Sequence, residues 1–281
     1  YETRLWSLFG QYTQKVGDLD LLLGLRQDNH DEYRDHLSYN AGVVWTPHSQ
    51  WILKTLYGTA YRTPFARQLL GDGNPELEKI KTLNLQVLWK PSERAGLSLC
   101  GFSSKIHNHI MEDPYAGLSM PNEQRIYGME FESHLSIGRD LDLAANLTLQ
   151  NNSGPDETYR YEKYKIPEPQ YEYLHYPYDA GPGRLFSLSG LWRAQDNMVF
   201  SAVLKYASST CLAYPRGENS VSLPGRWLLD IGFQKRDFII QGIELGVSLR
   251  NVTNKHYKVP GTYGLFDGEP FTAQVMLSMP W

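Results

Sequence analysis

The 281 residues carry a net charge of −4 at pH 7 and contain no run of lysine or arginine. A nucleic-acid partner requires a basic face, so that class of function is excluded. No stretch of about 18 apolar residues could cross a bilayer as a helix. Any membrane-spanning part must therefore consist of strands, which agrees with a mean hydropathy of −0.45 and with 19 tyrosines and 7 tryptophans, residues that favour membrane interfaces.

Alternation of apolar and polar residues predicts strands along the whole chain. The clearest case is residues 141–150, where Leu141, Leu143 and Leu147 alternate with Asp142 and Asn146. About thirteen strands are expected, at residues 4–16, 19–29, 37–45, 51–62, 83–89, 97–106, 125–137, 141–150, 186–192, 200–206, 227–233, 243–249 and 271–281.

The connections between these strands alternate between short turns and long loops. Gly17 and Asp18 form the first short turn, and residues 153–182 form the longest loop. Bacterial outer-membrane barrels show this asymmetry, with short periplasmic turns and long extracellular loops. Charged residues opposite the apolar face, such as Glu130 and Asp142, indicate a hydrated or plugged lumen. The expected fold class is all-β, a transmembrane antiparallel β-barrel in contact with outer-membrane lipid and lipopolysaccharide.

The position of the two chain ends adds an expectation about completeness. The first strand begins on the long-loop side, whereas the last strand ends on the turn side, and bacterial barrels normally have both ends in the periplasm. We therefore expect residues 1–281 to form one domain, the C-terminal portion of a larger barrel of about 22 strands. The N-terminal strands would lie in preceding sequence.

Residues 57–91 resemble a stretch of the TonB-dependent outer-membrane receptors. In that family a strand ends in Tyr-Arg-Xaa-Pro, and the next loop contains Gly-Asn-Pro-Xaa-Leu before an acidic or basic residue. The corresponding residues here are Tyr61, Arg62, Pro64, Gly73, Asn74, Pro75, Leu77 and Glu78. Further agreement comes from Gly128, Met129 and Glu130 in one strand and from Asn251, Asn254 and Tyr257 in the last hairpin. The family usually ends on phenylalanine, whereas this chain ends in Pro280 and Trp281.

The resemblance implies active import of a scarce nutrient across the outer membrane. Import would be coupled to the TonB complex through the family's plug domain, which would lie in preceding sequence. A ferric siderophore is the expected ligand. Import of haem, copper or cobalamin, or a passive porin-like channel, remains an alternative. The sequence contains no catalytic or cofactor-binding motif, so we expect neither an enzyme nor a cofactor.

The loop between residues 153 and 182 is rich in tyrosine and in cationic side chains. Aromatic faces and cations suit an anionic, ring-bearing iron chelate through stacking and charge. The alternative is that these tyrosines only fold the loop over the barrel mouth. The predicted ligand-binding residues are Tyr159, Arg160, Tyr161, Lys163, Tyr164, His175, Tyr176 and Tyr178, together with Tyr115 from another loop.

A second candidate site lies at the end of the strand that precedes residue 108. His107, His109 and Met111 alternate onto one face, and imidazole and thioether ligands suit copper or haem iron. The alternative is that these histidines are solvated. Cys100 and Cys211 fit no metal or redox spacing, and we expect them to be free thiols.

Overall fold

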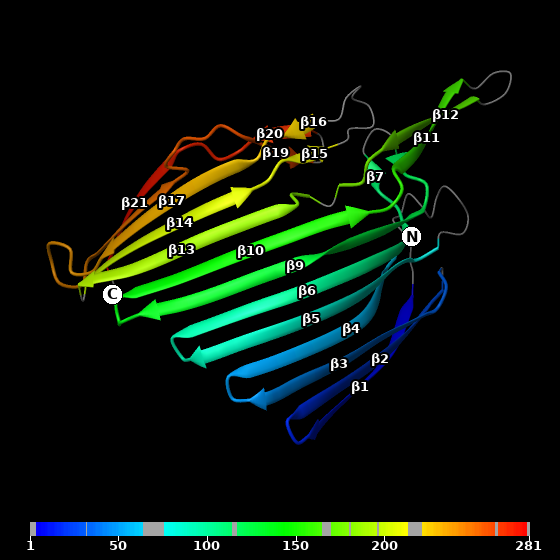
Figure 1. The fold of residues 1–281 in the computed structure, drawn as a ribbon. Helices are drawn as coiled ribbons and strands as arrows, with labels where there is room; N and C mark the ends of the chain where they lie inside the picture. Colours follow the sequence, from blue (N-terminus) through cyan, green and yellow to red (C-terminus); the bar gives the residue numbers. More distant parts are fainter. Residues whose placement is uncertain are drawn as a thin grey trace.

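The computed structural model describes residues 4–31, 33–63, 76–113, 117–164, 170–179, 181–195, 197–212, 221–261 and 264–279. Thirteen strands form one antiparallel sheet in which sequence neighbours lie side by side, confirming the all-β prediction. The strands are β1 (Leu5–Val16), β2 (Leu19–His30), β3 (His36–His48), β4 (Trp51–Arg62), β5 (Glu78–Ser92), β6 (Ala95–His109), β9 (Asn122–Ile137), β10 (Leu141–Ser153), β13 (Arg184–Gln195), β14 (Met198–Ala207), β17 (Arg226–Lys235), β18 (Glu244–Arg250) and β21 (Thr272–Ser278). Figure 1 shows that this sheet is strongly curved and that its short turns all lie at one end.

Within the described residues, four small hairpins stand at the other end of the sheet, where the long loops connect the strands (Figure 1). They are β7–β8 (Glu112–Asp113 and Gly117–Leu118), β11–β12 (Glu157–Tyr164 and Gln170–Tyr176), β15–β16 (Thr210–Leu212 and Val221–Leu223) and β19–β20 (Lys258–Gly261 and Gly264–Asp267). The sequence alone predicted these stretches as loops. The Gly-Asn-Pro turn at residues 73–75 and the terminal Pro280 and Trp281 lie outside the described residues.

The apolar face of the sheet points outward. Leu25, Leu85 and Val275 are 59%, 52% and 67% exposed, and these residues represent a band that runs across the whole sheet. Contiguous apolar surface of this extent is unstable in water and marks a membrane-facing surface. Among the described residues, no helix is long and apolar enough to cross a membrane.

Aromatic side chains bound the apolar band on both sides, as expected for interface girdles. At the short-turn end, Trp51 stacks on Trp89 with ring centroids 5.8 Å apart, and Phe200 stacks on Trp192 at 5.6 Å. At the long-loop end, Tyr39 lies 6.1 Å from Tyr57, and the ring of Trp227 contacts the rings of both Phe186 and Tyr206.

Several strands continue beyond the long-loop girdle, which explains why they are longer than predicted. The alternation reverses in this part of β5, where Lys79 and Lys81 are exposed and Ile80 lies on the inner side. Outside the membrane no lipid covers the outer side of the strand, so polar residues occupy that side. The buried apolar residues of the described chain gather at this end or in its hairpins: Leu77, Ile106, Ile110, Tyr159 and Leu223.

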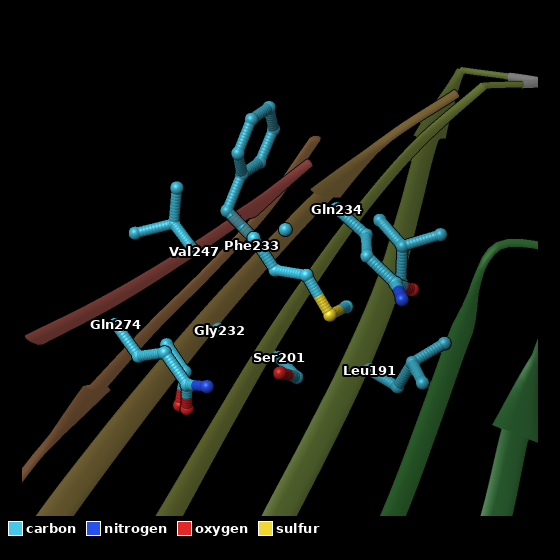
Figure 2. A pocket seen from close by; sticks show the side chains of 11 residues that line it. Leu191, Ser201, Gly232, Phe233, Gln234, Val247 and Gln274 are labelled. Carbon is cyan, nitrogen blue, oxygen red and sulfur yellow. The ribbon is translucent and has the colours of Figure 1, made fainter. Parts of the chain in front are cut away.

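The inner face of the sheet is polar and partly charged. Lys205 Nζ lies 2.7 Å from Asp230 Oδ2, and Arg193 binds Asp142 at 2.6 Å. A hollow of about 370 Å³ lies on the inner side near the short-turn end, where Ser201 and Gln274 project into it while Phe233 and Val247 project to the opposite side (Figure 2). The side chains of this hollow carry no charge.

Candidate ligand-binding rim

The β11–β12 hairpin extends beyond the main sheet on the long-loop side (Figure 1). Its strands pair antiparallel, with Arg160 opposite Tyr173. The Arg160 guanidinium lies 4.9 Å from the ring centroid of Tyr171, which is a cation–π distance. Tyr171 and Tyr173 are 46% and 50% exposed. The hairpin therefore presents aromatic faces and a guanidinium to solvent, a combination that suits a planar anionic ligand.

The residues predicted to bind ligand occupy different environments. Tyr159 is buried, and its ring meets that of Tyr176 edge to face at 6.1 Å, so this pair stabilises the base of the hairpin. His175 is exposed, with its Nδ1 3.0 Å from the Thr158 hydroxyl. Only the backbone is described for Tyr161, Lys163 and Tyr164, and Tyr115 lies outside the described residues. Ligand binding by this set stays a prediction.

The end of β6 contains a β-bulge that separates its two histidines. The pairing with β9 shifts between Ile106 and His109, and Asn108 has a φ of 57°. His107 Nδ1 lies 2.5 Å from Glu123 on β9, whereas His109 is buried and turned toward Glu78 on β5. The bulge thus breaks the simple alternation and gives each histidine its own carboxylate partner.

Met111, the third residue of the predicted metal site, is 41% exposed. Within the described residues, no group of three or more His, Cys, Asp or Glu side chains is arranged to hold a metal ion. Metal binding by His107, His109 and Met111 stays a prediction. The two cysteines, Cys100 and Cys211, are free.

A buried charged cluster surrounds His109, and sequence reasoning did not identify it. His109 Nδ1 lies 3.1 Å from Glu78 Oε2, and Arg62 binds the same oxygen at 2.7 Å. On the other side of the ring, Nε2 lies 3.4 Å from Glu157 Oε1. This second contact lacks hydrogen-bond geometry, and Nε2 has no hydrogen-bond partner in the described chain. Arg62 and Glu78 both belong to the motif at residues 61–78. This motif could have indicated from the sequence that the two side chains lie close together.

Glu157 is nearly inaccessible, with 5% of its side chain exposed. Asn122 donates to Glu157 Oε2 at 3.0 Å, and Gln124 donates to Oε1 at 3.4 Å. Gln124 is itself 1% exposed, and its Nε2 also donates to the Pro155 carbonyl at 2.8 Å. A buried carboxylate needs such donors because it has lost its hydration.

Burial and neighbouring charges shift two titrating groups in this cluster, which lies beyond the long-loop girdle. Burial raises the pKa of Glu78, but the hydrogen bond from His109 and the charge of Arg62 outweigh burial and leave the pKa below its usual value. For Tyr178, burial and the nearby carboxylates of Glu157 and Glu78 act together and raise the pKa. Glu78 is therefore ionised at neutral pH.

A second buried carboxylate, Asp28, lies at the same end of the sheet near the end of β2. It is 2% exposed and accepts a hydrogen bond from Arg26 Nε at 2.8 Å. Burial raises the pKa of Asp28, but hydrogen bonds from Ser7, Arg26 and Tyr61 outweigh burial and lower the pKa overall. The rim thus contains two carboxylates held in the charged form by specific partners.

Comparison with protein families gives one match that covers most of the chain. The family model described as "TonB dependent receptor-like, beta-barrel" matches residues 1–267. No curated protein matches the sequence.

Among solved structures, many resemble this fold at low sequence identity. The unliganded ferric citrate transporter FecA matches with a TM-score of 0.79 and 15% identity, over 99% of this chain and 45% of that chain. The siderophore receptor PiuA from Acinetobacter baumannii matches with a TM-score of 0.76 and 14% identity, over 98% and 43%. The ferric-catecholate import receptor Fiu from E. coli K12, in its closed form, matches with a TM-score of 0.75 and 14% identity, over 99% and 44%. The chain spans less than half the length of each of these structures.

Proposed function

The chain belongs to the TonB-dependent receptor family, in its β-barrel domain, and from this premise we propose that the protein imports a ferric siderophore across the outer membrane. The family match confirms the resemblance drawn from residues 57–91 and places the chain in the outer membrane. The observation that carries the proposal is the sheet itself, with a lipid-facing apolar side, a polar inner side and long-loop hairpins at one end. The similar structures are named for ferric citrate, siderophore and ferric-catecholate uptake, which supports an iron chelate as the ligand.

Binding would take place at the long-loop rim. Arg160, Tyr171 and Tyr173 offer a cation and exposed aromatic rings to an anionic chelate. We propose that Tyr161, Lys163, Tyr164 and His175 contribute to binding at the same hairpin, whereas the buried Tyr159 holds its base. Copper import would instead use His107, His109 and Met111, and both of these imidazoles already contact carboxylates.

The inner face suits a domain that fills the lumen. Glu130 and Glu132 line a hollow of about 280 Å³ with Lys54 and Cys100, and neither glutamate has an ion-pair partner in the described chain. We propose that a plug domain elsewhere in the protein covers this face and couples transport to the TonB complex. Phospholipid and lipopolysaccharide would surround the apolar band, and no covalent chemistry is involved.

Uptake measurements on cells test the proposal. A strain that lacks this gene should lose energy-dependent accumulation of one labelled ferric siderophore, and the plasmid-borne gene should restore it. Ferric catecholate, ferric citrate, haem, cobalamin and copper should be compared in parallel. Restored uptake of haem, cobalamin or copper alone would overturn the siderophore proposal, and steady ionic conductance of the purified full-length protein in planar bilayers would favour a passive channel.

A further inference from the structure

His109 lies between the two ends of the β11–β12 hairpin. Its Nε2 faces Glu157, the first residue of β11, at 3.4 Å. Its ring meets the ring of Tyr178, just after the end of β12, edge to face at 5.1 Å. With 7% of its side chain exposed, this single imidazole contacts both legs of the hairpin where they join the rim.

The imidazole is itself fixed to the main sheet. Its Nδ1 contacts Glu78 on β5, and Glu78 is held by Arg62 on β4 and by the backbone N–H of Ile110. A continuous row of contacts therefore runs from Arg62 through Glu78 and His109 to Glu157. The hairpin is connected to the sheet through this row, in which His109 and Glu157 are buried, Glu78 is partly buried and Arg62 is exposed. Its buried members are costly to separate.

The bulge at the end of β6 is what aims His109 into this position. Ile106 faces inward, and an uninterrupted alternation would place residue 109 on the opposite side of the strand from Ile106. The register shift and the left-handed backbone of Asn108 turn His109 back toward the inner cluster. Bulges are known to redirect single side chains in this way, and left-handed non-glycine residues persist where the surroundings require them.

We propose that His109 is a positioning residue for ligand recognition, which fixes the direction in which the β11–β12 hairpin leaves the rim. It would thereby set the place of Arg160 and Tyr171 over the mouth of the barrel. The inference deepens the proposed function and rests on it for its biological meaning. The mechanical part, a hairpin whose direction depends on this imidazole as well as on the hydrogen bonds from Asn122 and Gln124 to Glu157, stands on the contacts alone.

Distances between two spin labels test the mechanical part without any ligand. In the full-length protein in lipid vesicles, Cys100 and Cys211 are replaced by serine, and labels are attached after Tyr173→Cys on the hairpin and Lys81→Cys on β5. The native rim should give one narrow distance distribution. His109→Gln should increase the population outside this distance about tenfold or more, because the contacts of the buried His109 ring with Glu157 and Tyr178 are lost.

Glu157→Gln removes the same contact from the hairpin side and should broaden the distance distribution to the same extent. It therefore tests the proposal even if the His109→Gln protein does not reach the membrane. The double variant should be less broad than the sum of the two single variants, since the contact between His109 and Glu157 is lost in both of them. Asp267→Asn is the matched control. It removes an exposed ion pair with Lys258 in the β19–β20 hairpin and should leave the distribution unchanged.

Narrow distributions in both single variants, or a double variant whose broadening is the sum of the two, would overturn the proposal. The result is separable from the proposed function. If deletion of the gene left siderophore uptake unchanged while His109→Gln released the hairpin, the transport proposal would be overturned and the positioning role would stand.

Discussion

Replacing Leu85 by arginine tests whether the apolar face of the sheet meets lipid. Leu85 is 52% exposed on β5 and points to the same side as the girdle residue Trp89. The two residues are about 13 Å apart along the strand at about 3.3 Å per residue, and strand tilt reduces this to about 10 Å of depth. The apolar band of an outer-membrane barrel is about 25 Å tall, so Leu85 lies near its middle.

An arginine at the middle of the bilayer costs about 2–4 kcal/mol, whereas one near an interface costs about 0–1 kcal/mol. Leu85→Arg should therefore lower the free energy of unfolding from phospholipid bilayers by about 2–4 kcal/mol. Val87→Arg, closer to Trp89, should cost less. The matched control is Asn84→Arg, which places the same side chain on the inner face of the same strand and should cost less than about 1 kcal/mol.

The measurement is denaturant unfolding of the full-length protein from lipid vesicles, followed by tryptophan fluorescence. Equal costs for Leu85→Arg and Asn84→Arg would refute the assignment of the two faces, because a charge deep in the membrane should be costly only on the outer face.

Three further changes probe the rim. Arg160→Ala should weaken binding of the transported siderophore by about two- to fivefold in a fluorescence titration, since one exposed cation–π contact between a guanidinium and an aromatic ligand contributes about 0.5–1 kcal/mol; unchanged affinity would remove the hairpin from the binding surface. Asp28 has a pKa below its usual value, so its contribution to stability is present above the ordinary carboxyl pKa and is lost as the pH falls through the lowered one. Asp28→Asn should thus reduce the Tm at pH 7 and flatten its acid dependence below about pH 4, and an unchanged acid profile would contradict this. Asn108→Gly should keep the rim intact because glycine accepts a φ of 57°, whereas Asn108→Val should cost about 1–2 kcal/mol and expose His109, as judged by hydrogen exchange; equal effects would argue against the bulge.

The strands could be predicted because side-chain alternation is a local property. Leu141 to Leu149 alternate with polar residues, and the structure places this stretch in β10 as expected. The β11–β12 hairpin was missed because its length and tyrosine content favoured a loop, although Tyr159 and Tyr161 alternate along β11 and Tyr171 and Tyr173 alternate along β12. Its strands rise above the membrane, where no apolar face marks them.

The charged cluster at the rim could not be predicted from local patterns. Glu78, His109 and Glu157 are far apart in the sequence, and they meet only because β5, β6 and the β11–β12 hairpin end at the same rim. The bulge at Asn108 adds a second difficulty, since it reverses the side on which a regular strand would place His109. Tyr159 shows the opposite difficulty for prediction. Its residue type suits stacking on a ligand, but its side chain is buried.

The scarcity of buried apolar residues has a consequence for how the protein reaches its membrane. Within the described chain the sheet has no apolar interior, and side chains such as Leu8, Trp192 and Val275 are 67%, 52% and 67% exposed. In water the chain has nothing to fold around, and its alternating strands would instead pair with those of other copies. Lipid therefore takes the place of an apolar core. The protein must be kept apart from its own copies until it reaches the bilayer.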